Sequence, residues 1–200
     1  LYMTIIPFFI GGILGFIAGL LLVLTGPRGI LENRLVFFVL DKVTSIFRAI
    51  PFIILLALIN PFTRIIVGTG IGPTAALVPL SLAVFPFFAR QVQVVLSELD
   101  RGVIEAAQAS GATFWDIVGV YLREGLPDLI RVTTVTLISL VGETAMAGAI
   151  GAGGLGNVAL TYGYQRFNHD VTILATILIL LLIFFIQFVG DFLTRKISHR

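Results

Sequence analysis

This 200-residue chain offers few side chains for nucleophilic catalysis or metal binding. It has no cysteine, which excludes disulfides and cysteine-ligated metal or iron–sulfur sites. His169 and His199 are its only imidazoles, so we expect no histidine-based metal site. We therefore assign the chain no catalytic residue, no metal ligand and no bound cofactor, and we do not expect it to be an enzyme.

Glu143 is the titratable residue in the most unusual sequence context, because its only polar neighbours are Thr144 and glycines. A carboxyl group inside an apolar span is costly and indicates function by default. Glu143 would then face a water-filled pathway and attract a solute's ammonium group, or be neutral and hydrogen-bonded between helices. Alternatively, it is a structural partner of Arg48 or Arg90. Met146 is the second candidate pathway residue, although packing or lipid contact explains it more simply.

The segment 151–156, Gly-Ala-Gly-Gly-Leu-Gly, spells the GxGxxG pattern of dinucleotide-binding sites. That pattern has this meaning only between a strand and a helix of a βαβ unit, whereas here it follows an apolar stretch. We expect either a flexible turn beside a pathway or a closely packed helix turn. No GxxxxGK[ST] sequence occurs, so the chain has no P-loop, and any ATP hydrolysis must come from a separate protein.

Composition determines which elements must position these residues. The chain is 58% hydrophobic and only 12% charged, with a mean hydropathy of +1.06. A soluble domain of this size could not hide so much apolar surface, so lipid must be part of the solvent. The formal net charge of +2 is too balanced for a nucleic-acid binder.

The charged residues divide the sequence into apolar runs of the length that crosses a bilayer, about 20 residues. We expect an all-α polytopic membrane protein with a single domain and about five transmembrane helices, at about 1–25, 43–61, 72–96, 129–150 and 171–190. Gly11, Gly15 and Gly19 recur at every fourth position of the first span and predict close helix packing. Pro51 should kink the second span, and Arg48 should reach the interface from it.

The basic residues predict the orientation, because short cytoplasmic loops are enriched in Lys and Arg. With five spans, 11 of the 13 basic residues lie on the side of the C-terminus, and only Arg64 and Arg166 lie on the other. We therefore expect the N-terminus outside and the C-terminus in the cytoplasm. Arg64 and Arg166 would anchor the outer interface or contact an external protein.

The longest cytoplasmic connection, at about 97–128, is patterned like helices rather than like a loop. Its first part has a narrow face of small side chains at helical spacing: Val103, Ala106, Ala107 and Ser110. Gly111 then stands where a left-handed cap would end a helix, and Thr113 with Asp116 predicts an N-cap for a second one. Pro127 fits the first turn of the next span. The two short helices either receive a partner protein or pack on the chain itself.

The segment 105–111, Glu-Ala-Ala-Gln-Ala-Ser-Gly, resembles the Glu-Ala-Ala…Gly loop of ABC-importer permeases. That resemblance implies a coupling helix that sits in a groove of a cytoplasmic ATPase subunit and passes its motion to the membrane helices. The residues it implies for ATPase coupling are Glu105, Ala106, Ala107, Gly111, Ala112, Phe114 and Ile117.

The resemblance extends over nearly the whole chain and is narrower still, to permease subunits of methionine importers, which are binding-protein-dependent inner-membrane components. It rests also on the segments 47–56, 61–64, 148–156 and 187–191. It implies a bacterial inner-membrane homodimer, two ATPase subunits that bind the ATP, and an external methionine-binding lipoprotein. The cargo would be L-methionine, with or without the D-isomer.

Three other functions remain open from the residues alone. A permease for another amino acid or an osmolyte would share every feature above. A secondary transporter should show internal repeats, which five spans divide poorly. A membrane-embedded enzyme should show clustered acid, base or metal-binding residues near one interface.

Overall fold

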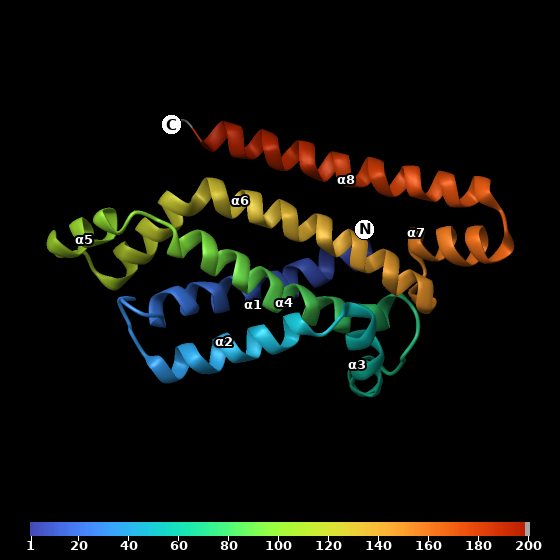
Figure 1. The fold of residues 1–200 in the computed structure, drawn as a ribbon, viewed down its shortest axis with the longest axis horizontal. Helices are drawn as coiled ribbons and strands as arrows, with labels where there is room; N and C mark the ends of the chain where they lie inside the picture. Colours follow the sequence, from blue (N-terminus) through green and yellow to red (C-terminus); the bar gives the residue numbers. More distant parts are fainter. Residues whose placement is uncertain (199–200) are drawn as a thin grey trace.

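The computed structural model describes residues 1–198, and the regular elements in that part of the chain are all helical (Figure 1). The expected all-α class is therefore confirmed. The helices are α1 (Tyr2–Thr25), α2 (Arg34–Ala49), α3 (Phe52–Val67), α4 (Pro73–Ser97), α5 (Arg101–Ala109), α6 (Phe114–Ala147), α7 (Gly154–Asn157) and α8 (His169–Ile197).

Helices α1 and α4 lie against each other because α1 presents glycines to α4. A Cβ atom at Gly15 would lie 2.6 Å from the carbonyl oxygen of Phe85, and one at Gly19 would lie 2.5 Å from that of Ala89. Gly11 approaches the backbone of α4 in the same way. The close helix packing predicted from the four-residue glycine spacing is therefore confirmed, since only glycine lets two helix backbones come this close.

The second expected span is not one kinked helix. α2 ends at Ala49, α3 begins at Phe52, and the two axes are bent by 108°. Pro51 lacks a backbone N–H and disfavours helical angles at Ile50, which accordingly has φ −81° and ψ 118°. Within residues 1–198, four helices are long and apolar enough to cross a membrane, or five if the broken α2–α3 pair is one span.

The fourth expected span is longer than expected at its N-terminal end. α6 runs for 34 residues from Phe114 to Ala147, so the second short helix of the connection is its first part. Pro127 therefore lies inside a helix, and the prediction that it begins one was wrong. The helix continues through the lost hydrogen bond because it packs closely on both sides of it: a Cβ at Gly125 would lie 2.7 Å from the side chain of Leu96, and Leu129 is buried.

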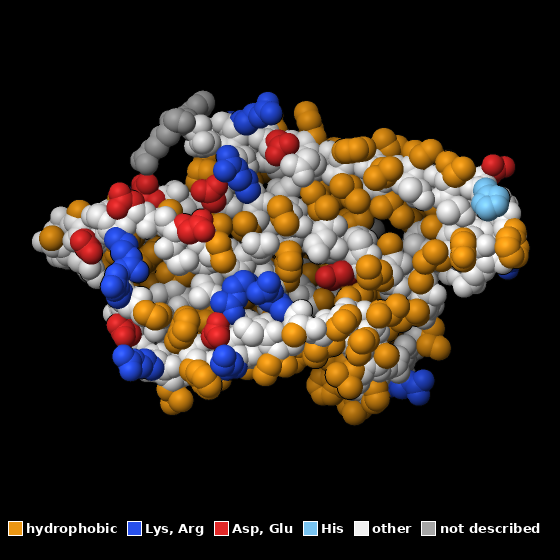
Figure 2. Space-filling model, viewed as in Figure 1, with side chains coloured by type: hydrophobic (Ala, Val, Ile, Leu, Met, Phe, Trp, Pro, Cys, Tyr) orange, Lys and Arg blue, Asp and Glu red, His pale blue; other side chains and the backbone are white. Residues whose placement is uncertain are grey.

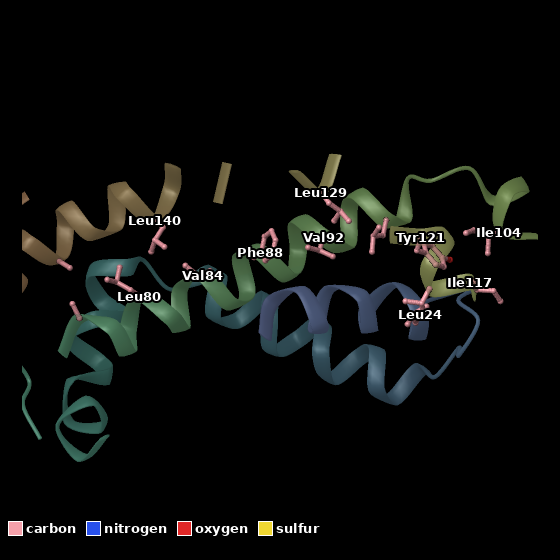
Figure 3. Close-up of a cluster of buried hydrophobic side chains, with 14 of the residues drawn as sticks. Leu24, Leu80, Val84, Phe88, Val92, Ile104, Ile117, Tyr121, Leu129 and Leu140 are labelled. Carbon is pink, nitrogen blue, oxygen red and sulfur yellow. The ribbon is translucent and has the colours of Figure 1, made fainter. Parts of the chain in front are cut away.

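One hydrophobic cluster connects the α5 end of the molecule to its opposite end along α4 (Figure 3). It includes Ile104 of α5, Ile117 and Tyr121 of α6, and Val92 and Leu80 of α4. Leu140 and Ala147 extend it to the far end of α6. These elements should move together, because a close-packed interior transmits displacement.

Buried polar residues in the described part are threonines, and most of them bond to their own helix. The hydroxyls of Thr25, Thr136 and Thr194 donate to the carbonyl oxygen four residues earlier, at 2.7, 2.7 and 2.9 Å. Helix α8, by contrast, exposes most of its large apolar side chains. A surface of this kind is suited to lipid, where polar groups must find partners within the protein.

The glycine-rich segment 151–156 forms a tight turn after α6 and includes the start of the short helix α7. Gly151, Gly153 and Gly154 have φ of +99°, +83° and +78°, values that favour glycine. A Cβ at Gly148 would lie 2.6 Å from the carbonyl oxygen of Gly153. The segment follows a helix and not a strand, so the closely packed turn is the interpretation that fits.

Candidate functional site

Helix α5 and the start of α6 form an exposed elbow (residues 100–116) at one end of the molecule (Figure 1). Asp100 caps α5 by accepting a 2.8 Å hydrogen bond from the Gly102 N–H. Gly111 has φ +77° and ends the helix as expected. Thr113 and Asp116 form the expected capping box, in which the backbone N–H of Thr113 donates to the Asp116 carboxylate at 2.9 Å.

The elbow exposes some of the expected coupling residues and buries another. Glu105, Ala106 and Gly111 are exposed, and Ala107, Ala112 and Phe114 are half-buried. Ile117 is only 6% exposed and belongs to the hydrophobic cluster beneath the elbow. It therefore supports the elbow from inside and does not form part of its surface.

Trp115 is a residue of the elbow that sequence reasoning missed. Its side chain is 77% exposed, and its ring meets that of Phe114 edge-on with centroids 5.1 Å apart. An exposed tryptophan is characteristic of protein–protein contacts. Its position between the two capping residues, on the side of the helix opposite to the buried Ile117, is the signal that could have identified it.

Glu105 lies on a different side of α5 from Ala106. With Arg101 and Gln108, one turn to either side, it lines a cleft of about 220 Å³ between α5, the end of α4 and the α1–α2 connection. Arg28 of that connection lines the same cleft. Glu105 therefore shares this cleft with Arg28 and Arg101, and no salt bridge joins it to either within the described residues.

A second cleft, of about 380 Å³, lies where the α2–α3 break meets α4 and α6. We call it the α2–α3 cleft; its lining includes Arg48, Pro51, Phe52, Phe87, Ser139 and Glu143. The Oε2 atom of Glu143 is buried and has no hydrogen-bond partner within the described residues. Met146 does not line this cleft and is 51% exposed.

The arginine partners considered for Glu143 are placed differently. Arg90 forms a 2.7 Å salt bridge with Asp41 and also bonds to Ser45 at 3.0 Å, so it is not the partner of Glu143. Arg48 shares the α2–α3 cleft with Glu143, but no ion pair joins them among residues 1–198. The structure thus brings the two charges to one cleft without pairing them.

Comparison with known proteins decides the family. The model of the family described as binding-protein-dependent transport system inner membrane component matches residues 4–199. The chain belongs to this family. Because the members of this family are transport components, the prediction that the chain is not an enzyme is confirmed.

Individual relatives of this transport family cover almost the whole chain. The probable D-methionine transport system permease protein MetI of Pasteurella multocida (strain Pm70) is 48% identical over 201 residues, 100% of this chain and 93% of that protein. The methionine import system permease protein MetP of Bacillus subtilis (strain 168) is 49% identical over 181 residues, 90% and 82% respectively. A solved structure of the MetNI methionine ABC transporter in an inward facing conformation has a TM-score of 0.95 at 45% identity, covering 98% and 92%.

Basic side chains of this inner-membrane component gather over the half of the molecule that contains α5 (Figure 2). Arg64 lies in the last turn of α3 and Arg166 precedes α8, both at the other end. Arg48 lies 14 residues beyond Arg34 on α2, or about 21 Å along the helix. His199 and Arg200 lie outside the described residues.

Proposed function

We propose that this chain is the permease subunit of an ATP-binding-cassette importer that moves methionine into the cytoplasm. The observation that carries the proposal is the exposed elbow at the basic end, on a chain that matches methionine permeases along its length. The close agreement with a methionine ABC transporter structure supports the same cargo and the same kind of ATP-driven assembly.

The assembly would contain a second copy of this chain and two cytoplasmic ATPase subunits, which bind the ATP. The elbow residues Glu105, Ala106, Ala107, Gly111, Ala112 and Phe114, with Trp115 beside them, would contact an ATPase subunit, and Ile117 would hold the elbow to the core. An external methionine-binding lipoprotein would deliver the cargo on the side of Arg64 and Arg166. In this arrangement the N-terminus would lie outside and the C-terminus in the cytoplasm, as the positive-inside rule favours.

The elbow would pass mechanical work to the membrane helices. Approach of the two ATPase subunits on binding ATP would displace α5, and the continuous helix α6 would carry that displacement past Tyr121 and Leu140 toward Glu143. Glu143 and Met146 stand on the far half of this helix, where the movement would open and close the pathway. The chain's own part is a rigid lever and a gate.

The test is reconstitution of the chain with its ATPase partner and the external binding protein in vesicles. We expect both partners to co-purify or bind, and methionine uptake to require ATP. Uptake of another amino acid in preference to methionine would replace the cargo, and binding assays with the external protein would identify it. Uptake by the chain alone, driven by an ion gradient, would refute the ATP-driven mechanism.

A further inference from the structure

We propose that the α2–α3 cleft is a binding site for a zwitterionic amino acid, in which Arg48 binds the carboxylate and Glu143 binds the ammonium group. The inference rests on the proposed function, since it assigns the recognition of an amino-acid cargo to the permease itself. Arg48 and Glu143 are the two charged residues that line the cleft.

The charge balance of the cleft selects the ligand class. One cation and one anion, unpaired with each other, match a ligand that carries both charges. Glu143 is half-buried, so a purely anionic solute would leave its charge unpaired, which is costly. Arg48 is exposed and adds a contact only for a ligand that also carries a carboxylate. The buried Oε2 atom of Glu143, unpartnered within the described residues, provides an acceptor for an ammonium group.

The remaining walls favour an apolar side chain on that amino acid. Phe47, Phe52, Leu55 and Phe87 line the cleft, and Ser139 is its single uncharged polar side chain. Polarizable thioethers make favourable contacts with aromatic rings. The cleft volume of about 380 Å³ also lies within the range of about 300–1,000 Å³ typical of small-molecule sites.

Each of the two charged residues lies at least about three turns along its own helix from an arginine of that helix. Arg48 is about 21 Å along α2 from Arg34, and Glu143 is about 18 Å along α6 from Arg131, at 1.5 Å per residue. Ionisable side chains within membrane-spanning helices characterise solute pathways.

The broken span is a second, independent indication of a binding site. Backbone without helical hydrogen bonds is tolerated at membrane depth only where it is buried in protein or lines a cavity. Ile50 and Pro51, the residues of the α2–α3 break, both line the α2–α3 cleft. Interrupted helices of this kind form the solute sites of many transporters.

The absence of cysteine makes the cleft directly testable, because Ser139→Cys places the chain's only thiol on its wall. In the complex with the ATPase subunits, we expect 10 mM L-methionine to slow labelling of this thiol by a small methanethiosulfonate reagent about tenfold, as expected for a Kd of about 1 mM. Ser97→Cys, which is exposed and outside the cleft, is the matched control and should not respond.

Two analogues separate the two charges. Methioninamide lacks the carboxylate and 4-(methylthio)butanoate lacks the ammonium group, so each should protect at least about tenfold more weakly than methionine, as expected when a charged hydrogen-bonding group is lost. In the Arg48→Gln background, methionine and methioninamide should protect equally. In the Glu143→Gln background, methionine and 4-(methylthio)butanoate should protect equally.

The outcomes distinguish this site from the proposed function. If the complex imports methionine but methionine leaves Ser139→Cys labelling unchanged, or both analogues protect as well as methionine, the site is wrong and the importer stands. If the complex imports no methionine, the proposed function fails first. Should either Gln variant fail to assemble, the analogue series in the unsubstituted background still decides the matter.

Discussion

Gly111 shows how one residue shapes the elbow that is proposed to contact the ATPase. Its φ of +77° favours glycine, and a Cβ atom built there would meet nothing within 4 Å. Within the chain, an effect of a side chain at this position must therefore come from the backbone angle and not from a clash.

We predict that Gly111→Ala lowers methionine uptake much more than it lowers basal ATPase turnover. A left-handed angle costs an L-residue about 1–2 kcal/mol, which the elbow would relieve by changing its geometry. Vesicle uptake and ATPase rate, measured on the same preparation, would show this. Gly111→Asn should recover much of the uptake, because asparagine tolerates that angle.

Gly119→Ala is the matched control, since that glycine lies inside α6 and also has open space around its Cβ position. Its uptake should equal that of the unsubstituted chain. If Gly111→Ala transports as well as Gly119→Ala does, the strain at the elbow has no functional role.

At the scale of elements, the α1–α4 contact depends on a face of glycines. Gly12 belongs to the same helix but stands one residue off that face, and a Cβ there would be 3.7 Å from its nearest neighbour, an ordinary contact distance. Gly15 has only 2.6 Å to the backbone of α4. The same Gly→Ala substitution at Gly12 and at Gly15 therefore tests close packing alone, because the chemical change is identical at the two positions.

We predict that Gly15→Ala destabilises the protein by about 1–3 kcal/mol, as expected for overpacking against a backbone that cannot rotate away. The measurement is the thermal unfolding midpoint of the purified complex in detergent. Gly12→Ala should leave the midpoint nearly unchanged, and equal midpoints for the two variants would contradict the packing interpretation.

At the scale of the whole molecule, the proposed orientation joins the elbow, the basic side chains and the C-terminal end of α8 on one side of the membrane. Figure 1 places α5 and the end of α8 at the same end, away from α3 and α7. Exposed residues at both ends can therefore report which end faces the cytoplasm.

We predict that Thr69→Cys, in the exposed connection after α3, reacts with a membrane-impermeant thiol reagent in intact cells. Ser110→Cys in the elbow should react only after the membrane is opened. The cysteine-free sequence makes each thiol unique within the chain. The reverse pattern would place the elbow outside and would refute the docking of a cytoplasmic ATPase.

Sequence alone was sufficient for features that depend on neighbours along the chain. The apolar composition required lipid, the four-residue glycine spacing predicted a packing face, and Gly111 with the Thr113–Asp116 pair predicted the turn of the elbow. These features follow from local backbone geometry and from hydrophobic burial, both of which can be read from residue type and spacing.

Only the tertiary structure decided what each proline does and which charges meet. The helices on either side of Pro51 are bent by 108°, with extended backbone angles at Ile50, whereas Pro127 lies within the continuous helix α6, where close packing compensates for the lost bond. Arg48 and Glu143 are 95 positions apart (143 − 48), so no local pattern could place them in one cleft. The physical reason is that long-range contacts depend on how helices pack, which spacing along one helix does not specify.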